Sequence, residues 1–470
     1  MKRLLPLLLC PALLLTGCHF RLPEAPVSGA SDPSGPHAQP SQVNTLILGL
    51  LQGDALDPYQ ARSDANRAVC SLLYESLITA DADDQPQLCL AATAQVTGER
   101  ILVSLRADAR FSDGSAVTPQ DVEASLQAAR QSDRYRETAG RIEGLETNGG
   151  TMIFTVTAGS PQPQLLLTFP IIRQTGGPVP LGSGPYRYSG GTLYPTRDVQ
   201  LGSIPLRTYE DLSALRRARG GGELTFYYDT LSEGFVPQIT GASEAVPLTS
   251  LAILCFNGQQ GITAGAQVRQ ALSAALRREE LTAAFGGYAR PAHTLFPASW
   301  QTPEIVQEKK IKDVVAQWRQ LGYNTEANPS GIGPLQLLVP RENGFLTAAA
   351  EQVAQQLAQV SVQVEVRRVP SAAWEQERLA GQYDLLLTQV DLPADWDLTG
   401  LLARYAPGML AAYTGRRSAQ AFCTAFAAAL PFVPLCRRAA MAAFPRALQY
   451  TEMTEQQPLS GIEQWSFSGV

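Results

Sequence analysis

The chain has 470 residues, of which 37 are basic and 43 acidic, so its formal net charge is −6. Hydrophobic residues make up 45% and charged residues 17%, a globular mixture that argues against wholesale disorder. The acidic balance and the lack of a long basic run argue against a nucleic-acid binder. Histidine occurs only at His19, His37 and His293, which comes close to excluding a metal site of several histidines.

The first eighteen residues predict export. The apolar run Leu4–Leu15 follows two basic residues, is too short to span a bilayer comfortably and has the flanks of a signal peptide. It ends in Leu15-Thr16-Gly17-Cys18, which resembles a bacterial lipobox. We therefore predict that residues 1–17 are removed and that Cys18 becomes a lipidated N-terminus on the outside of a membrane. The alternative is a plain secretory signal with a chance cysteine.

Residues 18–42 are expected to form a disordered tether behind the lipidated cysteine. Five prolines are interleaved there with serine and glycine, a composition that cannot bury a core and stays extended. Such a tether would let the globular body sit clear of the membrane surface. No later stretch is apolar enough to span a membrane.

Seven cysteines occur in the chain, and none has the spacing of a metal site. Without Cys10 and Cys18, five remain: Cys70, Cys89, Cys255, Cys423 and Cys436. In an exported protein some of them could pair, and buried free thiols are the alternative.

The first part of the globular body is expected to be rich in strands. An apolar run at 45–50 predicts a buried strand, and residues 66–79 predict a helix with one apolar face. Two further strands are expected at 101–106 and 152–157, with an Asp-Gly turn between them. Thr118-Pro119-Gln120-Asp121 predicts a helix start, because threonine caps, proline suits the first helical position and the aspartate follows three residues after the cap.

Strands and helices alternate in the second part of the body. The run Gly182–Tyr186 predicts a turn that enters a strand. Strands are expected at 224–228, 251–256, 335–339, 362–366 and 385–390, and helices at 268–276, 314–321 and 346–360. Between 251 and 400 the order is β-α-α-β-α-β-β, which is typical of an α/β layer domain.

Several short motifs follow one another in an order that resembles one protein family. The most specific combines Leu105-Arg106, Phe111-Ser112-Asp113-Gly114 and Val117–Val122. The others are Leu72–Leu77, Gly182–Tyr186, Leu254–Asn257 with Val268–Leu272, Gly287–Ala292, and Gln352–Leu357 with Gly381–Asp384. Together they resemble the family 5 extracellular solute-binding proteins, the peptide-, dipeptide- and nickel-binding receptors of ABC importers. The resemblance runs from about residue 45 to 440.

This resemblance implies an α/β, two-lobed fold like that of the periplasmic binding proteins (type II, cluster C-like). In that fold two strands cross between the lobes, and a β-rich subdomain is inserted in lobe I. Mapped on this chain, lobe I is 43–60, 175–250 and 430–470, its inserted subdomain is 61–174, and lobe II is 251–429. Ligand would bind between the lobes, and closure of the hinge would bury it.

The resemblance also implies candidate ligand-binding residues. In the family, a carboxylate in a loop with two aspartates receives the free amino group of the ligand, and the matching stretch here offers Asp391, Asp395 and Asp397. An arginine that meets a ligand carboxylate would correspond to Arg341. The aromatic candidates for side-chain pockets are Tyr186, Tyr228, Trp300 and Trp396, with packing in the core as the alternative.

We therefore predict a substrate-binding lipoprotein of an ABC importer, monomeric and extracytoplasmic, with its lipid anchor at Cys18. It would capture peptides, or a similar small solute, in the cleft between the lobes and deliver them to the permease. No enzyme, cofactor, metal site or nucleic-acid partner is expected, since Gly220-Gly221-Gly222 lacks a following Gly-Lys-Ser/Thr and no Gly-x-Ser-x-Gly occurs. The alternatives are a surface lipoprotein of the same fold that senses or interacts, and a metal- or heme-binding receptor.

Overall fold

The computed structural model describes residues 45–239, 241–323, 334–415, 418–451 and 453–468. The described residues all belong to one compact unit. The predicted signal peptide, Cys18 and the tether therefore lie outside the described residues. Among the residues described, no helix is both long and apolar enough to cross a membrane.

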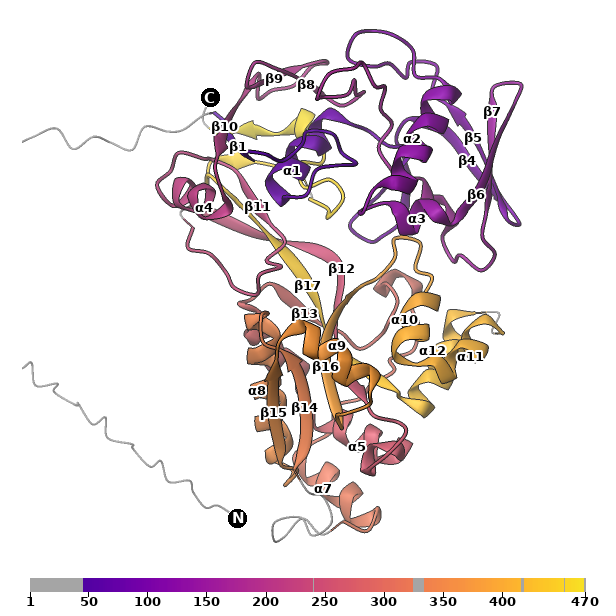
Figure 1. Ribbon diagram of the computed structural model, residues 1–470, viewed down its shortest axis with the longest axis vertical. Coiled ribbons are helices and arrows are strands. Elements are labelled where there is room, and N and C mark those ends of the chain that lie inside the picture. Colours follow the sequence, from indigo (N-terminus) through magenta and orange to yellow (C-terminus); the bar gives the residue numbers. More distant parts are fainter. Residues whose placement is uncertain (1–44, 240, 324–333, 416–417, 452, 469–470) are drawn as a thin grey trace, which may run out of the picture. The chain divides into compact units, whose positions relative to one another are not determined.

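One hydrophobic core surrounds a mixed sheet of seven strands (Figure 1). The strands are β11 (Tyr227–Asp229), β12 (Ala242–Phe256), β13 (Ala289–Pro291), β14 (Leu335–Pro340), β15 (Val364–Val369), β16 (Leu385–Asp391) and β17 (Phe432–Phe444). Strands β14, β15 and β16 are parallel, and β12 joins them antiparallel to β16. The helices of this part are α5 (Ala266–Ala275), α6 (Arg278–Thr282), α7 (Ile311–Gln320), α8 (Gly344–Ala358), α9 (Ser371–Leu379), α10 (Thr399–Tyr405), α11 (Leu410–Thr414) and α12 (Ala419–Ala429).

A second core packs two four-stranded sheets and several helices. One sheet has the order β1 (Leu48–Leu51), β10 (Ile204–Tyr209), β9 (Thr192–Pro195), β8 (Tyr186–Ser189). The other has the order β4 (Ala91–Thr97), β5 (Arg100–Leu105), β7 (Thr151–Val156), β6 (Ile142–Asn148). The helices are α1 (Asp64–Leu73), α2 (Pro119–Gln131) and α3 (Arg136–Gly140), and two small pairs are β2 (Ile78–Ala80) with β3 (Pro86–Leu88) and β18 (Leu448–Gln449) with β19 (Ser466–Phe467). Helix α4 (Leu212–Gly220) packs Leu215 and Ala218 into the first core.

Two long strands connect the cores. β12 and β17 run antiparallel side by side, with irregular register between Pro247 and Leu251 (Figure 1). Residues 251–256 of β12 pack in the first core, whereas Val246 and Leu248 of the same strand pack in the second. Each strand therefore contributes side chains to both cores, which ties them together at a narrow pair of crossing strands.

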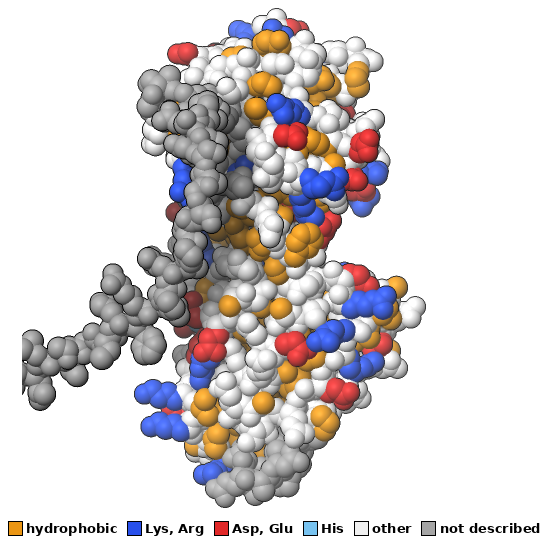
Figure 2. Space-filling view, turned by 90° about the vertical axis from the view of Figure 1, so that its left-hand side faces the viewer, with side chains coloured by type: hydrophobic (Ala, Val, Ile, Leu, Met, Phe, Trp, Pro, Cys, Tyr) orange, Lys and Arg blue, Asp and Glu red, His pale blue; other side chains and the backbone are white. Residues whose placement is uncertain are grey.

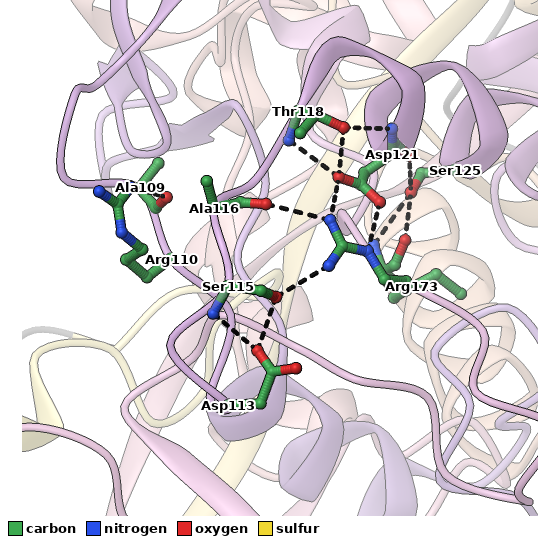
Figure 3. Close-up of polar contacts among 10 residues, drawn as sticks. Ala109, Arg110, Asp113, Ser115, Ala116, Thr118, Asp121, Ser125 and Arg173 are labelled. Atoms are coloured by element: carbon green, nitrogen blue, oxygen red, sulfur yellow. Dashed lines mark hydrogen bonds and ion pairs between the residues drawn. The ribbon is translucent and has the colours of Figure 1, made fainter.

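The most specific sequence motif folds into a polar network that holds α2 in place. Thr118 and Asp121 form a capping box at the start of α2, as predicted. The guanidinium of Arg173 donates to the Asp121 carboxylate at 2.7 and 2.8 Å and to Ser115 Oγ at 2.8 Å (Figure 3). Asp113 accepts from the backbone and hydroxyl of Ser115 in the adjoining turn (Figure 3). These contacts account for the motif by local structure alone.

The glycines of the Gly-Ser-Gly-Pro-Tyr run permit a close approach of two backbones. A Cβ atom on Gly182 would lie 2.0 Å from the carbonyl oxygen of Leu73, and one on Gly184 would lie 2.3 Å from that of Leu72. Any side chain there would push the segment away from the end of α1.

Two expectations about secondary structure are wrong. The helix predicted over 66–79 ends at Leu73, because Tyr74 is extended and the apolar residues that follow pair in a short strand instead. The predicted order between 251 and 400 also lacks α9, which lies between β15 and β16. α9 buries only Trp374, so it has no apolar stripe by which the sequence could reveal it.

The cysteines of the described residues form no disulfide. Cys70, Cys255, Cys423 and Cys436 are buried free thiols, and Cys89 is a partly buried one. Burial raises the pKa of Cys89 and Cys436 to about 12, so these thiols stay protonated. Of the two alternatives left open by the sequence, the structure has the buried thiols.

Candidate ligand-binding site

A cavity of about 520 Å³ is lined by segments that are distant in the sequence. They are helix α1, the residues around the start of α3, the end of β11, the loop that follows β16, and residues 455–458. A second cavity of about 360 Å³ shares six of the lining residues: Asp64, Arg67, Tyr228, Thr230, Asp391 and Glu455. The two cavities are thus parts of one space, called the cleft below.

The cleft is rich in carboxylates that the protein holds in fixed positions. Asp64 Oδ2 accepts from the backbone N–H and the hydroxyl of Thr230, both at 2.7 Å. Glu455 Oε2 accepts from the backbone N–H and the hydroxyl of Thr249 at 2.7 and 3.0 Å. Burial raises the pKa of both carboxyl groups above their ordinary values. A cationic ligand group would therefore relieve the cost of ionising them.

Asp391 offers a free carboxylate to the cleft. It is the last residue of β16, lies opposite Ser250 of β12, and lines both cavities. Its side chain is exposed and has no hydrogen bond or ion pair with any other residue that the structure describes. Asp391 is thus available to an ammonium group without first breaking a protein contact.

A free cation faces the same cleft. Arg134 lines the larger cavity, with its guanidinium 5.5 Å from the centre of the Tyr135 ring. Among the described residues its side chain has no carboxylate partner within 4 Å. Arg67, also in the cleft, lies 3.9 Å from Asp64. The cleft therefore presents both signs of charge to one ligand.

Asp395, the second candidate carboxylate predicted from the sequence, already has partners within the protein. It is 1% exposed, it does not line the cleft, and Ser160 Oγ donates to it at 2.6 Å. Arg141 pairs with it and also with Asp397, at 2.7 Å from Asp397. Burial raises the pKa of Asp395, although Arg141 opposes the rise. This cluster joins Arg141, which lies between α3 and β6, to the loop after β16.

The other predicted residues lie away from the cleft. Trp396 is buried under the Arg437 guanidinium, at 5.1 Å, and Trp300 stacks on Phe296 at 5.0 Å. Tyr186 is fully buried beside a separate cavity of about 250 Å³. Arg341 is exposed and pairs with Glu342 at 3.3 Å. Of the candidate residues predicted from the sequence, Asp391 and Tyr228 line the cleft.

The sequence reading missed most of the residues that line the cleft, among them Asp64, Arg134, Thr230, Thr249 and Glu455. They are spread over almost 400 residues and stand in no motif of chemical spacing. No group of three or more His, Cys, Asp or Glu among the described residues is arranged to hold a metal ion. The face in Figure 2 carries charges of both signs interspersed, without the concentrated basic footprint of a nucleic-acid binder.

Two cores joined by crossing strands, with a charged cleft lined from both, define a two-lobed solute-binding protein. The model of the bacterial extracellular solute-binding proteins, family 5, matches residues 85–407, and the chain belongs to this family. Members of this family are extracytoplasmic transport binding proteins, not enzymes; they bind small solutes and work with ABC permease subunits. No sequence among the curated proteins matches this chain.

Solved structures share the fold at low sequence identity. The murein tripeptide-binding protein MppA, in its unliganded open form, is 18% identical with a TM-score of 0.72, covering 90% of this chain and 99% of its own. A nickel ABC transporter protein from Bacillus halodurans is 20% identical with a TM-score of 0.72, covering 90% and 100%. The binding protein AgaA of A. tumefaciens R10, in complex with agropinic acid, is 18% identical with a TM-score of 0.58, covering 91% and 99%.

Proposed function

We propose that this chain is the substrate-binding lipoprotein of an ABC importer and that its solute is a short peptide or a similar zwitterion. The observation that carries the proposal is the pair of free, opposite charges in one cavity, Asp391 and Arg134. A peptide has an ammonium group at one end and a carboxylate at the other, so it can satisfy both. Among the described residues neither side chain has a hydrogen bond, or an ion pair within 4 Å, that a ligand would have to break.

The size of the cleft favours a short ligand. Its two parts measure about 520 and 360 Å³, within the range of small-molecule sites. Asp391, rather than Asp395, is the candidate contact for the ammonium group, because Asp395 already binds Arg141 and Ser160. The peptide-binding name of one structural neighbour is in keeping with this ligand.

Two further parts of the proposal concern the membrane and the lobes. Cys18 would carry the lipid that holds the protein outside the membrane, and labelling with a radioactive fatty acid should be lost in Cys18→Ser. Lobe I would comprise 43–60, 175–250 and 430–470, with 61–174 inserted, and lobe II would comprise 251–429. The contribution of β12 and β17 to both cores supports a hinge at these strands.

The direct test is thermal unfolding of the mature chain with pools of di- to hexapeptides, and with nickel and heme as controls. A ligand at 100 times its Kd adds about 2.7 kcal/mol of stability, a shift of a few degrees for a chain of this size. We expect a shift with the short peptides only, and its loss in Asp391→Asn. Asp108→Asn is the matched control, because Asp108 is an exposed carboxylate outside the cleft. A shift with nickel or heme alone would overturn the peptide assignment.

A further inference from the structure

We infer that the smaller part of the cleft is a subsite for a neutral carbonyl oxygen, formed by the side chains of Tyr228, Ser250 and Gln389. All three line the cavity of about 360 Å³. Its ligand group would be a carboxamide, as in the side chains of asparagine and glutamine. The inference rests on the proposed function, because it names the class of peptide that the same cleft selects.

The sheet register brings two of these side chains to one face. Ser250 of β12 lies opposite Asp391 of β16, and Ala252 lies opposite Gln389. Residues two apart on a strand point to the same side, so Ser250, Gln389 and Asp391 share a face. Tyr228, on β11, lines the same cavity from across β17. The subsite is thus built on strands, which hold side chains more firmly than loops do.

Two of the donors are buried and have no partner. Tyr228 is 5% exposed and Ser250 3% exposed, and neither hydroxyl has a hydrogen-bond partner among the described residues. An unsatisfied buried polar group costs about 1–3 kcal/mol. Phenylalanine and alanine would fill the same positions without that cost. A ligand oxygen that accepts from these hydroxyls supplies the hydrogen-bond partner that the folded protein does not provide.

The third donor is oriented by a buried arginine. Arg438 Nη1 donates to Gln389 Oε1 at 2.8 Å, and an arginine can only donate, so the amide oxygen faces Arg438. The guanidinium is itself held between two aromatic rings, 5.0 Å from the centre of Phe285 and 4.6 Å from that of Phe345. The amide nitrogen of Gln389 has no acceptor among the residues that the structure describes. It remains as a donor toward the cavity that the residue lines.

The charge around the subsite selects a neutral acceptor. Asp64, Asp229, Asp391 and Glu455 line this cavity, against the three arginines Arg62, Arg67 and Arg216. Arg216 is committed to Asp229 at 2.9 Å and to Glu233 at 2.6 Å. Asp64 pairs with Arg67 at 3.9 Å, so the lining charges without an ion pair among the described residues are Asp391 and Glu455 against Arg62. A ligand carboxylate would add to this negative excess, whereas a carboxamide oxygen would accept from the donors without adding charge. An apolar side chain would leave the donors unsatisfied.

The test compares dipeptides of similar size by calorimetry with the mature chain. Alanine and glutamine form two dipeptides, one for each order of the residues, and the reference is the one that binds more tightly. We expect it to bind at least about 10-fold more tightly than the dipeptides of the same order in which methionine or glutamate replaces glutamine. Tyr228→Phe and Ser250→Ala should each weaken the glutamine dipeptide about 5-fold and leave the methionine dipeptide unchanged. Ser371→Ala is the control, since Ser371 lies outside the cleft and its hydroxyl donates to Glu342 at 2.9 Å.

Three results would overturn the inference in distinguishable ways. Equal affinities for the glutamine and methionine dipeptides, with binding still lost in Asp391→Asn, would overturn the subsite and leave the proposed function standing. A loss of affinity for both dipeptides in Tyr228→Phe would overturn the subsite as well, because the hydroxyl would then not read the side chain. Failure of the wild-type chain to bind any dipeptide would overturn the proposed function and this inference with it.

Discussion

Two carboxylates four residues apart, Asp391 and Asp395, stand in contrasting surroundings. Asp395 is buried and bonded to Arg141 and Ser160, while Asp391 ends a strand and faces the cleft without a partner. In the sequence the two are interchangeable candidates for the same role. The difference teaches that a carboxylate is available to a ligand only where the fold has not already supplied its cation.

The same contrast extends to the neighbouring groups. Around Asp395, the Arg141 guanidinium is shared with Asp397, so the cation and its two carboxylate partners are buried as one cluster. Around Asp391, the hydroxyls of Tyr228 and Ser250 are buried without partners. The first region, the ionic cluster of Arg141, Asp395 and Asp397, is complete by itself. The second region, the cleft wall, is completed only by a ligand.

The largest expected effect comes from removing the cation of the ionic cluster. Arg141→Met leaves the carboxylates of Asp395 and Asp397 without their shared partner, and we expect a loss of about 3 kcal/mol in the free energy of unfolding. Urea denaturation measures it. Arg136→Met is the control, because the pair of Arg136 with Asp133 is exposed and should contribute less than about 1 kcal/mol. Equal losses in the two variants would remove the distinction between cluster and surface.

A smaller effect should separate the two aspartates directly. Asp395→Asn keeps the shape but weakens the bonds to Arg141 and Ser160, and it should cost about 1–2 kcal/mol of stability. Arg141 retains Asp397, which is why the loss is smaller than that of Arg141→Met. Asp391→Asn should stay within about 0.5 kcal/mol of the wild type while it abolishes peptide binding. The opposite pattern, a stable Asp395→Asn and an unstable Asp391→Asn, would reverse the comparison.

The sequence predicted the fold far better than the site, for a physical reason. Motifs such as Phe111–Gly114 and Gly182–Tyr186 exist because of local turns and close backbone approaches, so they can be read from neighbouring residues. The cleft is assembled by tertiary contacts between residues as distant as Asp64 and Glu455. Whether such a residue can bind a ligand depends on its burial and on whether it already has a hydrogen-bond or ion-pair partner in the protein. No local sequence pattern encodes either property. The same holds for Asp395, whose partner Arg141 is 254 residues away.

The pH dependence of stability should report on the carboxylates of the cleft wall. Burial raises the pKa of Glu455 above its ordinary value of 4.5, so the folded state keeps a proton that the unfolded chain has lost. The stability that Glu455 contributes therefore falls as pH rises from about 4.5 through the folded pKa. Glutamine does not titrate, so the stability of Glu455→Gln relative to the wild type should increase over this range.

Urea titrations at pH 4 and pH 7 measure this difference in the wild type and in Glu455→Gln. A cationic ligand should reduce this difference between pH 4 and pH 7, because its binding favours the ionised carboxylate of Glu455. For the same reason, the peptide affinity of the wild type should rise with pH over this range. Glu143→Gln, a variant of an exposed residue outside the cleft, is the control for the loss of one carboxylate from the protein. A pH-independent difference for Glu455→Gln would mean that the cleft does not perturb this carboxylate.

The smallest expected effect has the opposite sign. Tyr228→Phe removes a buried hydroxyl that has no partner, so the ligand-free variant should be about 1 kcal/mol more stable than the wild type. Tyr74→Phe is the matched control, because the Tyr74 hydroxyl donates to the carbonyl of Leu56 at 2.7 Å and its loss should cost about 1 kcal/mol. Thermal unfolding without ligand separates the two. If Tyr228→Phe is destabilised like Tyr74→Phe, its hydroxyl already has a partner and the cleft wall is complete without a ligand.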